Sequence, residues 1–228
     1  MRAGRHLVVF AKAPALGRVK RRLAADIGAL AALRFQRAAT ACLLRRVARD
    51  HRWRCWLALT PDRAAAGPRF WRLPCRRIPQ GLGDLGQRMA RPFRHLPPGP
   101  IILVGSDIPA ITAGEIAAAF RLLGEHHLVF GPARDGGFWL VGAGGRRLPR
   151  GLFARVRWSS PRTLADTLAN VPRSWRVAQA ATLEDVDDGA AYRRWRAGAE
   201  AKQSRQVADC PSPALRERVA SVARRVRV

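Results

Sequence analysis

The sequence lacks the features that mark membrane proteins, secreted proteins and metal-stabilised domains. No apolar run approaches the ~20 residues that a membrane-spanning helix needs. The apolar part of the N-terminal stretch runs only from Leu7 to Ala11, which is too short for the apolar segment of a secretory signal. The four cysteines form no C-x-x-C pair and have no histidine at ligand spacing, so neither a zinc site nor a redox dithiol is indicated. We therefore expect a soluble, cytoplasmic protein with no membrane partner.

Lysine and acidic residues are scarce although the chain is strongly charged. Only three of its 42 basic residues are lysines and only 16 residues are acidic, which gives a formal net charge of +26. Such a charge is typical of proteins that bind nucleic acid. The arginines, however, are spread through every segment and form no block with interleaved aromatic residues. We favour a general bias toward arginine and expect nucleic acid to bind only nonspecifically.

Short apolar runs alternate with segments of helical length along the 228 residues. Runs at 6–11, 54–60 and 100–107 each precede such a segment, a rhythm typical of a parallel sheet wrapped by helices. The stretch 127–143 joins two apolar runs through PARDGG, which predicts either a hairpin or two strands whose loop lies in a cleft. The segment 22–50 predicts an amphipathic helix. Its expected inner stripe is Leu30, Leu33, Ala38, Ala41, Leu44 and Val47.

The composition changes after about residue 200. From there the chain is polar, is broken by Pro211 and Pro213, and ends in a short basic amphipathic piece. A length of 228 residues fits one α/β domain with an appendage. We predict a single domain over 1–200 and a flexible or loosely docked basic tail over 201–228. No oligomeric state is indicated.

Two of the three lysines lie in one loop, FAKAPALGRVKRRL at 10–23, directly after the first apolar run. Ligands of α/β sheets bind beyond the carboxyl ends of the strands, and N–H groups at the start of the next helix favour an anion. The loop therefore predicts a triphosphate cradle, although its cations could also be merely solvated. Lys12 and Lys20 are stronger candidates for phosphate binding than the arginines, because guanidinium does not replace a compact ammonium where space is tight.

Asp107 follows four strongly apolar residues and should stand at the tip of a central buried strand. A carboxylate there suits Mg²⁺ or Mn²⁺, which would bridge it to nucleotide phosphates. The other role for an acid at this place is to cap the next helix. Thr112 and Glu115 already form a capping-box pattern, which leaves Asp107 free.

A second group of acids lies in LEDVDDG, which contains Glu184, Asp185, Asp187 and Asp188. Asp185 and Asp187 would share one face of an extended segment. Four acids within five residues repel one another unless cations or a helix N-terminus compensate. A metal ion is one such compensation, and a helix capped by Asp188 near an arginine is the other.

Two glycine-rich stretches complete the predicted cleft. QGLGDLGQRM at 80–89 permits close approach of the backbone to a base or ribose, or it is a loop in which Asp84 caps a helix. GPARDGGF at 131–138 offers Asp135 as an acceptor for substrate hydroxyl groups, or it is an ordinary Asp-Gly turn.

These motifs, in this order, resemble the DUF2064 family of transferases related to molybdenum-cofactor and 2-phospho-L-lactate guanylyltransferases. The resemblance covers about residues 5–196 and includes VGSDIP, WSS and LEDVDDGAAY besides the stretches quoted above. It implies an α/β fold of the nucleotide-diphospho-sugar transferase (GT-A) type, a three-layer α/β/α sandwich with a mixed, mostly parallel sheet. Two positions depart from the family: Arg21 replaces a usual threonine, and DDGAAY lacks a usual proline.

The residues and the resemblance together define an expected site. The expected metal ligands are Asp107 and Asp187, for Mg²⁺ or Mn²⁺, and the expected catalytic residues are Lys20, Lys12 and Asp107. The expected nucleotide-binding residues are Ala11, Lys12, Gly17, Arg18, Lys20, Arg22, Gly83 and Asp84. The expected substrate-binding residues are Asp135, Gly136 and Gly137.

Three activities remain open. The basic first loop favours nucleotidyl transfer from an NTP to a small phosphorylated acceptor. Some members of the family act on nucleotide sugars, so glycosyl transfer is the alternative, although Ser106-Asp107-Ile108 contains one acid where sugar transferases of this fold more often have an Asp-x-Asp pair. The remote alternative is a nucleic-acid-binding protein on an inactive transferase fold.

Overall fold

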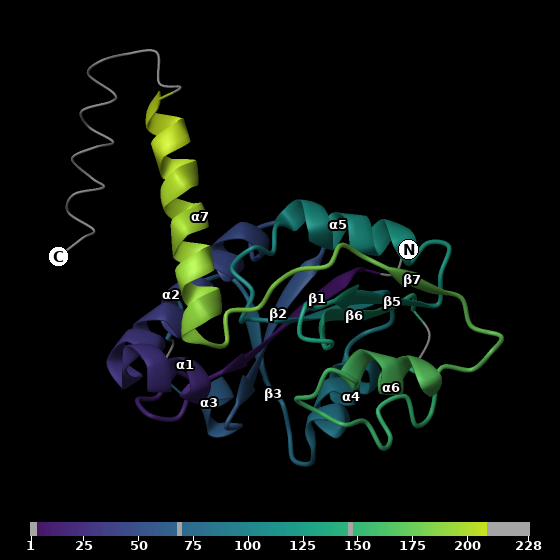
Figure 1. The fold of residues 1–228 in the computed structure, drawn as a ribbon. Coiled ribbons are helices and arrows are strands. Elements are labelled where there is room, and N and C mark those ends of the chain that lie inside the picture. Colours follow the sequence, from purple (N-terminus) through teal and green to yellow (C-terminus); the bar gives the residue numbers. More distant parts are fainter. Residues whose placement is uncertain (1–3, 68–69, 146–147, 209–228) are drawn as a thin grey trace.

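The computed structural model describes residues 4–67, 70–145 and 148–208, with side chains through residue 198. Within these residues one sheet has the strand order β3-β2-β1-β4-β6-β5-β7 (Figure 1). The strands are β1 (His6–Lys12), β2 (Arg54–Thr60), β3 (Arg76–Pro79), β4 (Ile101–Gly105), β5 (Leu128–Pro132), β6 (Phe138–Ala143) and β7 (Val177–Gln179). Strand β6 is antiparallel to β4 and β5, and the other neighbouring pairs are parallel. The mixed, mostly parallel sheet is confirmed, and the stretch 127–143 forms the hairpin.

Helices cover both faces of this sheet and confirm the three-layer sandwich (Figure 1). The helices are α1 (Arg21–Ile27), α2 (Ala29–Val47), α3 (Arg63–Ala66), α4 (Leu85–His95), α5 (Ala113–Leu122), α6 (Thr163–Ala169) and α7 (Gly189–Ala208). Helices α2 and α5 pack on one face, and α4 and α6 on the other. None of the described helices is long and apolar enough to cross a membrane.

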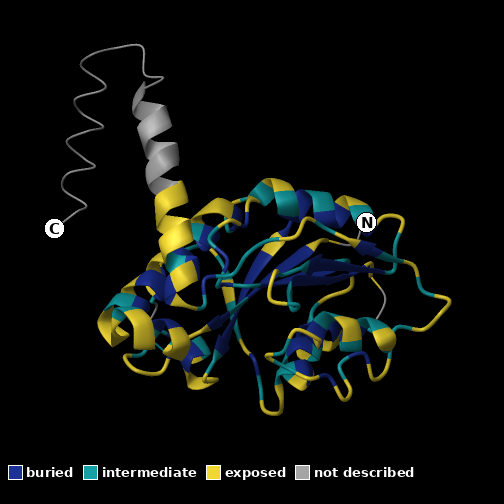
Figure 2. Cartoon of the chain, in the orientation of Figure 1, coloured by how far each residue is buried: buried dark blue, intermediate teal, exposed yellow. Residues whose placement is uncertain are grey.

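The central strands are buried on both faces, as Figure 2 shows for the sheet. In β1, Leu7 and Val9 pack into the cluster beneath α2 and α5, whereas Val8 packs into the cluster above α4. A strand buried on both faces reads as a continuous apolar run instead of an alternating one. This is why the runs at 6–11 and 100–107 were recognisable as strands.

The predicted long helix over 22–50 is wrong in two respects. Gly28, with φ of +86°, ends α1 and begins α2, so two helices replace one. The inner face of α2 is also displaced, because Leu30 is 53% exposed while the polar Gln36 and Thr40 are buried. A prediction that counts only apolar residues could not assign Gln36 and Thr40 to the buried face. Ala32, Phe35 and Ala39 form a separate small core with α1 and the start of α7.

Helix α7 runs through the predicted domain boundary between residues 200 and 201 and continues to Ala208. The remainder of the predicted tail, 209–228, lies outside the described residues. The division into a domain over 1–200 and a tail over 201–228 stays a prediction.

Candidate active site

Some of the predicted site residues, among them Lys20, Asp107 and Asp187, meet at the edge of the sheet where β1, β2 and β4 end. Asp107 follows β4, which is the middle strand of the sheet. The backbone N–H of Val186 donates to the carbonyl oxygen of Asp107 over 3.3 Å. This bond places the acidic segment 184–188 beside the end of the central strand, some 80 residues away in the chain.

Lys20 joins the two acids that we predicted as metal ligands. Its Nζ lies 3.2 Å from Oδ2 of Asp107 and 2.5 Å from Oδ1 of Asp187. The side chain of Lys20 is only 5% exposed, whereas the two carboxylates are about half exposed. The three residues come from three separate segments, so the fold itself brings them together.

The backbone of Lys20 is strained. Its φ of 47° and ψ of 52° lie in the left-handed region, immediately before α1. For a residue other than glycine this backbone conformation costs about 1–3 kcal/mol, and it persists only where the surrounding structure imposes it. The conformation points the ammonium at Asp107 and Asp187, and strain of this kind is typical of functional sites.

The charge of Lys20 is stabilised despite its burial. Burial alone would lower its pKa, but the negative charges of Asp107 and Asp187 outweigh burial and raise the pKa above the ordinary value of 10.5. Lys20 is therefore the counter-ion of two acids here. The phosphate-binding role that we predicted for it requires that the ammonium leave them.

Asp185 is the acid of the site whose charged form is disfavoured. Burial, together with the charges of Asp187 and Asp135, raises its pKa to about 6 from the ordinary 3.8. The folded protein thus holds a proton on Asp185 that the unfolded chain releases near pH 4. The stability of the fold consequently falls as the pH rises from about 4 to about 6, and the full cost of the ionised Asp185 remains at higher pH.

We predict that Asp185→Asn stabilises the protein at pH 7.5 and that most of this effect is lost by pH 4, where the folded protein keeps the proton and the unfolded chain is only partly ionised. The gain should be about 1 kcal/mol after allowance for partial exposure, or about 2–4 °C in Tm. Calorimetry in EDTA across pH 4–8 measures it. Glu184→Gln is the control and should not stabilise at pH 7.5, because Glu184 pairs with Arg194. A pH-independent gain from Asp185→Asn would contradict the assignment.

The helix-cap interpretation of the acidic cluster is confirmed for two of its residues, and metal binding by the others stays a prediction. Asp188 accepts from the backbone N–H of Ala191 over 2.7 Å and caps α7, and Glu184 pairs with Arg194 over 2.6 Å. Asp187 instead forms an ion pair with Lys20, and the charge of Lys20 partly offsets the raised pKa of Asp185. That Asp185 and Asp187 share one face stays a prediction.

Two cavities lie on either side of Lys12. The smaller, of about 340 Å³, is lined by residues from the ends of β1, β2 and β4 and includes Lys20, Asp107 and Arg88. The larger, of about 830 Å³, lies between the first loop and α3 and includes Gly17, Arg18 and Arg21. Lys12 and Thr60 line both. The predicted cradle is thus divided between two adjoining spaces.

The predicted nucleotide-binding residues divide accordingly. Ala11 and Lys20 line the smaller cavity, and Gly17 and Arg18 line the larger one. Arg22 is exposed on α1 and lines neither of these two cavities. Its role in nucleotide binding stays a prediction.

Two buried glutamines hold the strand ends in place, and we did not predict them. Nε2 of Gln80 donates to the carbonyl oxygens of Ala11 and Ala58, both over 3.1 Å. Nε2 of Gln36 donates to the carbonyl oxygen of Lys12 over 3.0 Å. For Gln80 the only available signal was a polar residue directly after a short strand, which fits an ordinary loop equally well. Gln36 lies inside α2, and no short pattern marks it. Both side chains line the smaller cavity.

The loop around Gly83 and Asp84 has a structural role. Asp84 caps α4, since its Oδ1 accepts from the backbone N–H of Gln87 over 2.7 Å, and Gln87 completes a capping box. Gly83 has φ of +105°, and a Cβ there would lie 2.0 Å from Oε1 of Gln87. The helix cap therefore explains both residues, and contact with a nucleotide stays a prediction.

The turn with Asp135, Gly136 and Gly137 contacts the connection between β6 and α6. Oδ1 of Asp135 accepts from the backbone N–H of Gly137 over 2.8 Å, as in an ordinary Asp-Gly turn. A Cβ on Gly136, with φ of +85°, would lie 2.2 Å from the carbonyl oxygen of Pro161. Glycine is required here for that close approach. Substrate binding by this turn stays a prediction.

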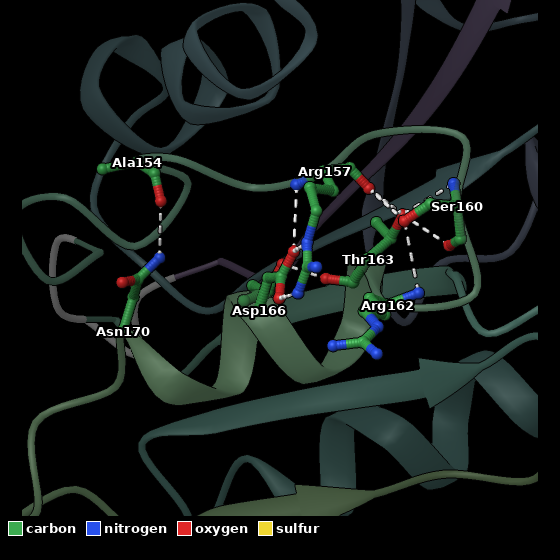
Figure 3. A network of polar contacts seen from close by, with 8 residues as sticks. Ala154, Arg157, Ser160, Arg162, Thr163, Asp166 and Asn170 are labelled. Carbon is green, nitrogen blue, oxygen red and sulfur yellow. Dashed lines mark hydrogen bonds and ion pairs between the residues drawn. The ribbon is translucent and has the colours of Figure 1, made fainter.

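The connection itself is tied to α6 by the polar network in Figure 3. Arg157 forms two hydrogen bonds with Asp166 through its guanidinium, and the hydroxyl of Thr163 donates to the carbonyl oxygen of Arg157. The amide of Asn170 donates to the carbonyl oxygen of Ala154. These bonds hold the region of the WSS motif against α6.

The donor set fits a divalent cation. Asp107 and Asp187 supply hard carboxylate oxygens that already converge on one cation, the ammonium of Lys20. Mg²⁺ takes one or two protein carboxylates and completes its shell with water and phosphate oxygens. No group of three or more acidic, histidine or cysteine ligands occurs among the described residues. The arrangement therefore suits an ion that shares its shell with a ligand.

The model of a family described as an uncharacterised protein conserved in bacteria, DUF2064, matches residues 43–160, which is just over half of the chain. The chain belongs to the DUF2064 family. This confirms the family that its motifs resembled. No curated protein matches the chain significantly.

Solved structures place this DUF2064 protein among nucleotide-diphospho-sugar transferase folds. A candidate nucleotide-diphospho-sugar transferase from Desulfovibrio desulfuricans G20 is 26% identical over 81% of this chain and 82% of its own, with a TM-score of 0.70. 4-Diphosphocytidyl-2C-methyl-D-erythritol synthase from Anaerococcus prevotii DSM 20548 is 10% identical over 87% and 99%, with a TM-score of 0.58. CMP:2-keto-3-deoxy-manno-octonic acid synthetase complexed with CTP is 13% identical over 88% and 100%, with a TM-score of 0.51. The expected fold is confirmed by all three structures, and the D. desulfuricans structure, at 26% identity, supports a transferase.

Proposed function

We propose that this protein is a divalent-metal-dependent transferase that moves a nucleotidyl group from an NTP to a small phosphorylated acceptor. One observation carries the proposal. Asp107 and Asp187, from segments far apart in the chain, converge on the buried ammonium of Lys20 beside a cavity of about 340 Å³ at the carboxyl ends of the strands. Ligands of α/β sheets bind at this edge.

Asp107 and Asp187 would hold Mg²⁺ or Mn²⁺, which would neutralise negative charge on the phosphoryl oxygens. The chain's cations neutralise the rest. In the proposed reaction an oxygen of the acceptor phosphate attacks the α-phosphorus, the bond to the bridging oxygen breaks, and pyrophosphate leaves with that electron pair. Lys12, at the boundary of both cavities, and Arg18, in the larger one, are positioned to bind phosphoryl oxygens. Lys20 adds a third cation once it parts from the two acids.

Glycosyl transfer from a nucleotide sugar is the second candidate. The observation in its favour is the described activity class of the D. desulfuricans structure, a nucleotide-diphospho-sugar transferase. The one acid at Ser106-Asp107-Ile108, in place of an Asp-x-Asp pair, favours nucleotidyl transfer.

A thermal-shift panel tests the two candidates. The purified protein is heated with ATP, GTP, CTP, UTP and nucleotide sugars, each with and without Mg²⁺ or Mn²⁺. A ligand at a hundred times its Kd stabilises the fold by ~2.7 kcal/mol, so a real site gives a clear shift. We expect a metal-dependent shift with one NTP. A shift with a nucleotide sugar but not its parent NTP would establish glycosyl transfer instead, and no shift with any of them would refute both.

A further inference from the structure

Arg88 lines the same cavity as Lys20 and Asp107 but pairs with no acid. Its Nη1 donates to Oε1 of Gln80 over 3.2 Å, and its Nε donates to the backbone carbonyl oxygen of Asp84 over 3.4 Å. Both acceptors are neutral. Among the residues that the structure describes, no carboxylate forms an ion pair with Arg88. A half-buried guanidinium of this kind lacks a counter-ion.

The orientation of Arg88 is fixed by Gln80. The Gln80 side chain is 2% exposed, and both strand-end carbonyls that it contacts, those of Ala11 and Ala58, can only accept. Its amide nitrogen must therefore face the strands, so its amide oxygen faces Arg88. A buried side chain with three fixed partners is rigid, and it holds the guanidinium at the wall of the cavity.

The cationic side chains of the cavity differ in whether an acid pairs with them. The ammonium of Lys20 is already neutralised by Asp107 and Asp187. Of the cavity's three cationic side chains, Lys12 and Arg88 have no ion pair within the described part of the chain. An anionic ligand in this cavity would meet these two first.

We propose that Arg88, oriented by Gln80, is a binding subsite for phosphoryl oxygens. The inference rests on the proposed function, because it gives a place in the site to a phosphate of the nucleotide or of the acceptor. A guanidinium has five N–H donors. Two are used here, and the remaining three suffice for the paired hydrogen bonds that arginine makes with phosphate.

The experiment compares wild type, Arg88→Met, Arg88→Lys and Arg91→Met by calorimetric titration with Mg²⁺ present. Arg91→Met removes the same charge from the same helix, at an exposed position that does not line this cavity, and so controls for the strong net charge. The probes are pyrophosphate, the four NTPs and their nucleosides. A further arm adds inorganic phosphate to protein saturated with the best NTP, which separates an acceptor phosphate from a nucleotide phosphate.

We expect Arg88→Met to raise the Kd of pyrophosphate and of the bound NTP by about tenfold to a hundredfold and to leave the nucleoside within about twofold. Arg88→Lys should recover part of the loss, and Arg91→Met should cause none. If the NTP is unaffected and only phosphate binding to the NTP-loaded protein is lost, the subsite belongs to the acceptor and the proposal still stands.

Other results overturn it. Equal losses for nucleoside and NTP would place Arg88 against the base or ribose, and equal losses in Arg88→Met and Arg91→Met would show a general charge effect. If Arg88→Met binds all the phosphate probes as tightly as wild type does, Arg88 is not a phosphate subsite. Wild type that binds pyrophosphate but no NTP would refute the proposed function and leave the subsite intact. Wild type that binds none of the probes would refute both.

Discussion

Asp107→Asn should abolish the metal-dependent binding of the nucleotide and lower turnover by about 10²–10³-fold. The substitution keeps the shape of the side chain and the backbone bond between Asp107 and Val186 but removes one of two carboxylates that converge on a cation. Loss of one charged group that stabilises developing charge commonly costs this much in rate. Mn²⁺ titration followed by electron paramagnetic resonance measures metal binding, and the thermal shift with the NTP measures nucleotide binding.

Asp50→Asn is the matched control for this variant. Asp50 is a half-buried carboxylate paired with Arg52, and it precedes β2, at the opposite edge of the sheet from the site. It should leave Mn²⁺ and nucleotide binding unchanged. Full nucleotide binding by Asp107→Asn in the presence of metal would contradict the placement of the metal.

Asp107→Asn also distinguishes a transferase from a nucleic-acid-binding protein. On the second interpretation the net charge of +26 carries the function, and loss of one negative charge leaves the affinity for DNA unchanged or improves it. A strong decrease of affinity with salt does not distinguish the two, since nonspecific adhesion of so basic a protein gives it as well. The loss of a metal-dependent nucleotide response without a loss of DNA binding would assign the function to the site.

The layers of the fold were predictable because the pattern that defines them is local. Central strands of a parallel sheet read as apolar runs, and their carboxyl ends share one edge, so Asp107 and the first loop could be placed together. The helix caps were equally local, and the capping box of Thr112 and Glu115 is present as predicted. The break at Gly28 was missed because glycine inside a helical pattern is tolerated often enough to be ambiguous.

The partners of the charged residues were not predictable. The composition of the first loop indicated phosphates for Lys20, but its contacts are two acids, one of them 167 residues away in the chain. Arg88 could not be distinguished among 39 arginines, since only its buried contact with Gln80 makes it unusual. Burial and pairing across long separations arise from packing, and a single sequence does not encode them in any short pattern.

Lys20→Met should change metal binding and nucleotide binding in opposite directions. With the ammonium removed, Asp107 and Asp187 lose their internal counter-ion, so the affinity for Mn²⁺ alone should rise by about tenfold, given the size of charge interactions at ~3–4 Å near a surface. The additional stabilisation by the NTP should fall, because the cation that would reach the phosphates is gone. Mn²⁺ titration without nucleotide, followed by thermal shifts with the metal and the NTP, measures the two effects separately.

Lys12→Met is the control, since Lys12 belongs to the same loop and has no ion pair within the described residues. It should leave the affinity for Mn²⁺ alone unchanged and weaken only the nucleotide. A wild type and a Lys20→Met variant with equal Mn²⁺ affinity would show that Lys20 does not compete with the metal. The strained backbone of Lys20 would then serve only to bridge the acids, whereas competition would make Lys20 a side chain that the metal releases toward the phosphates.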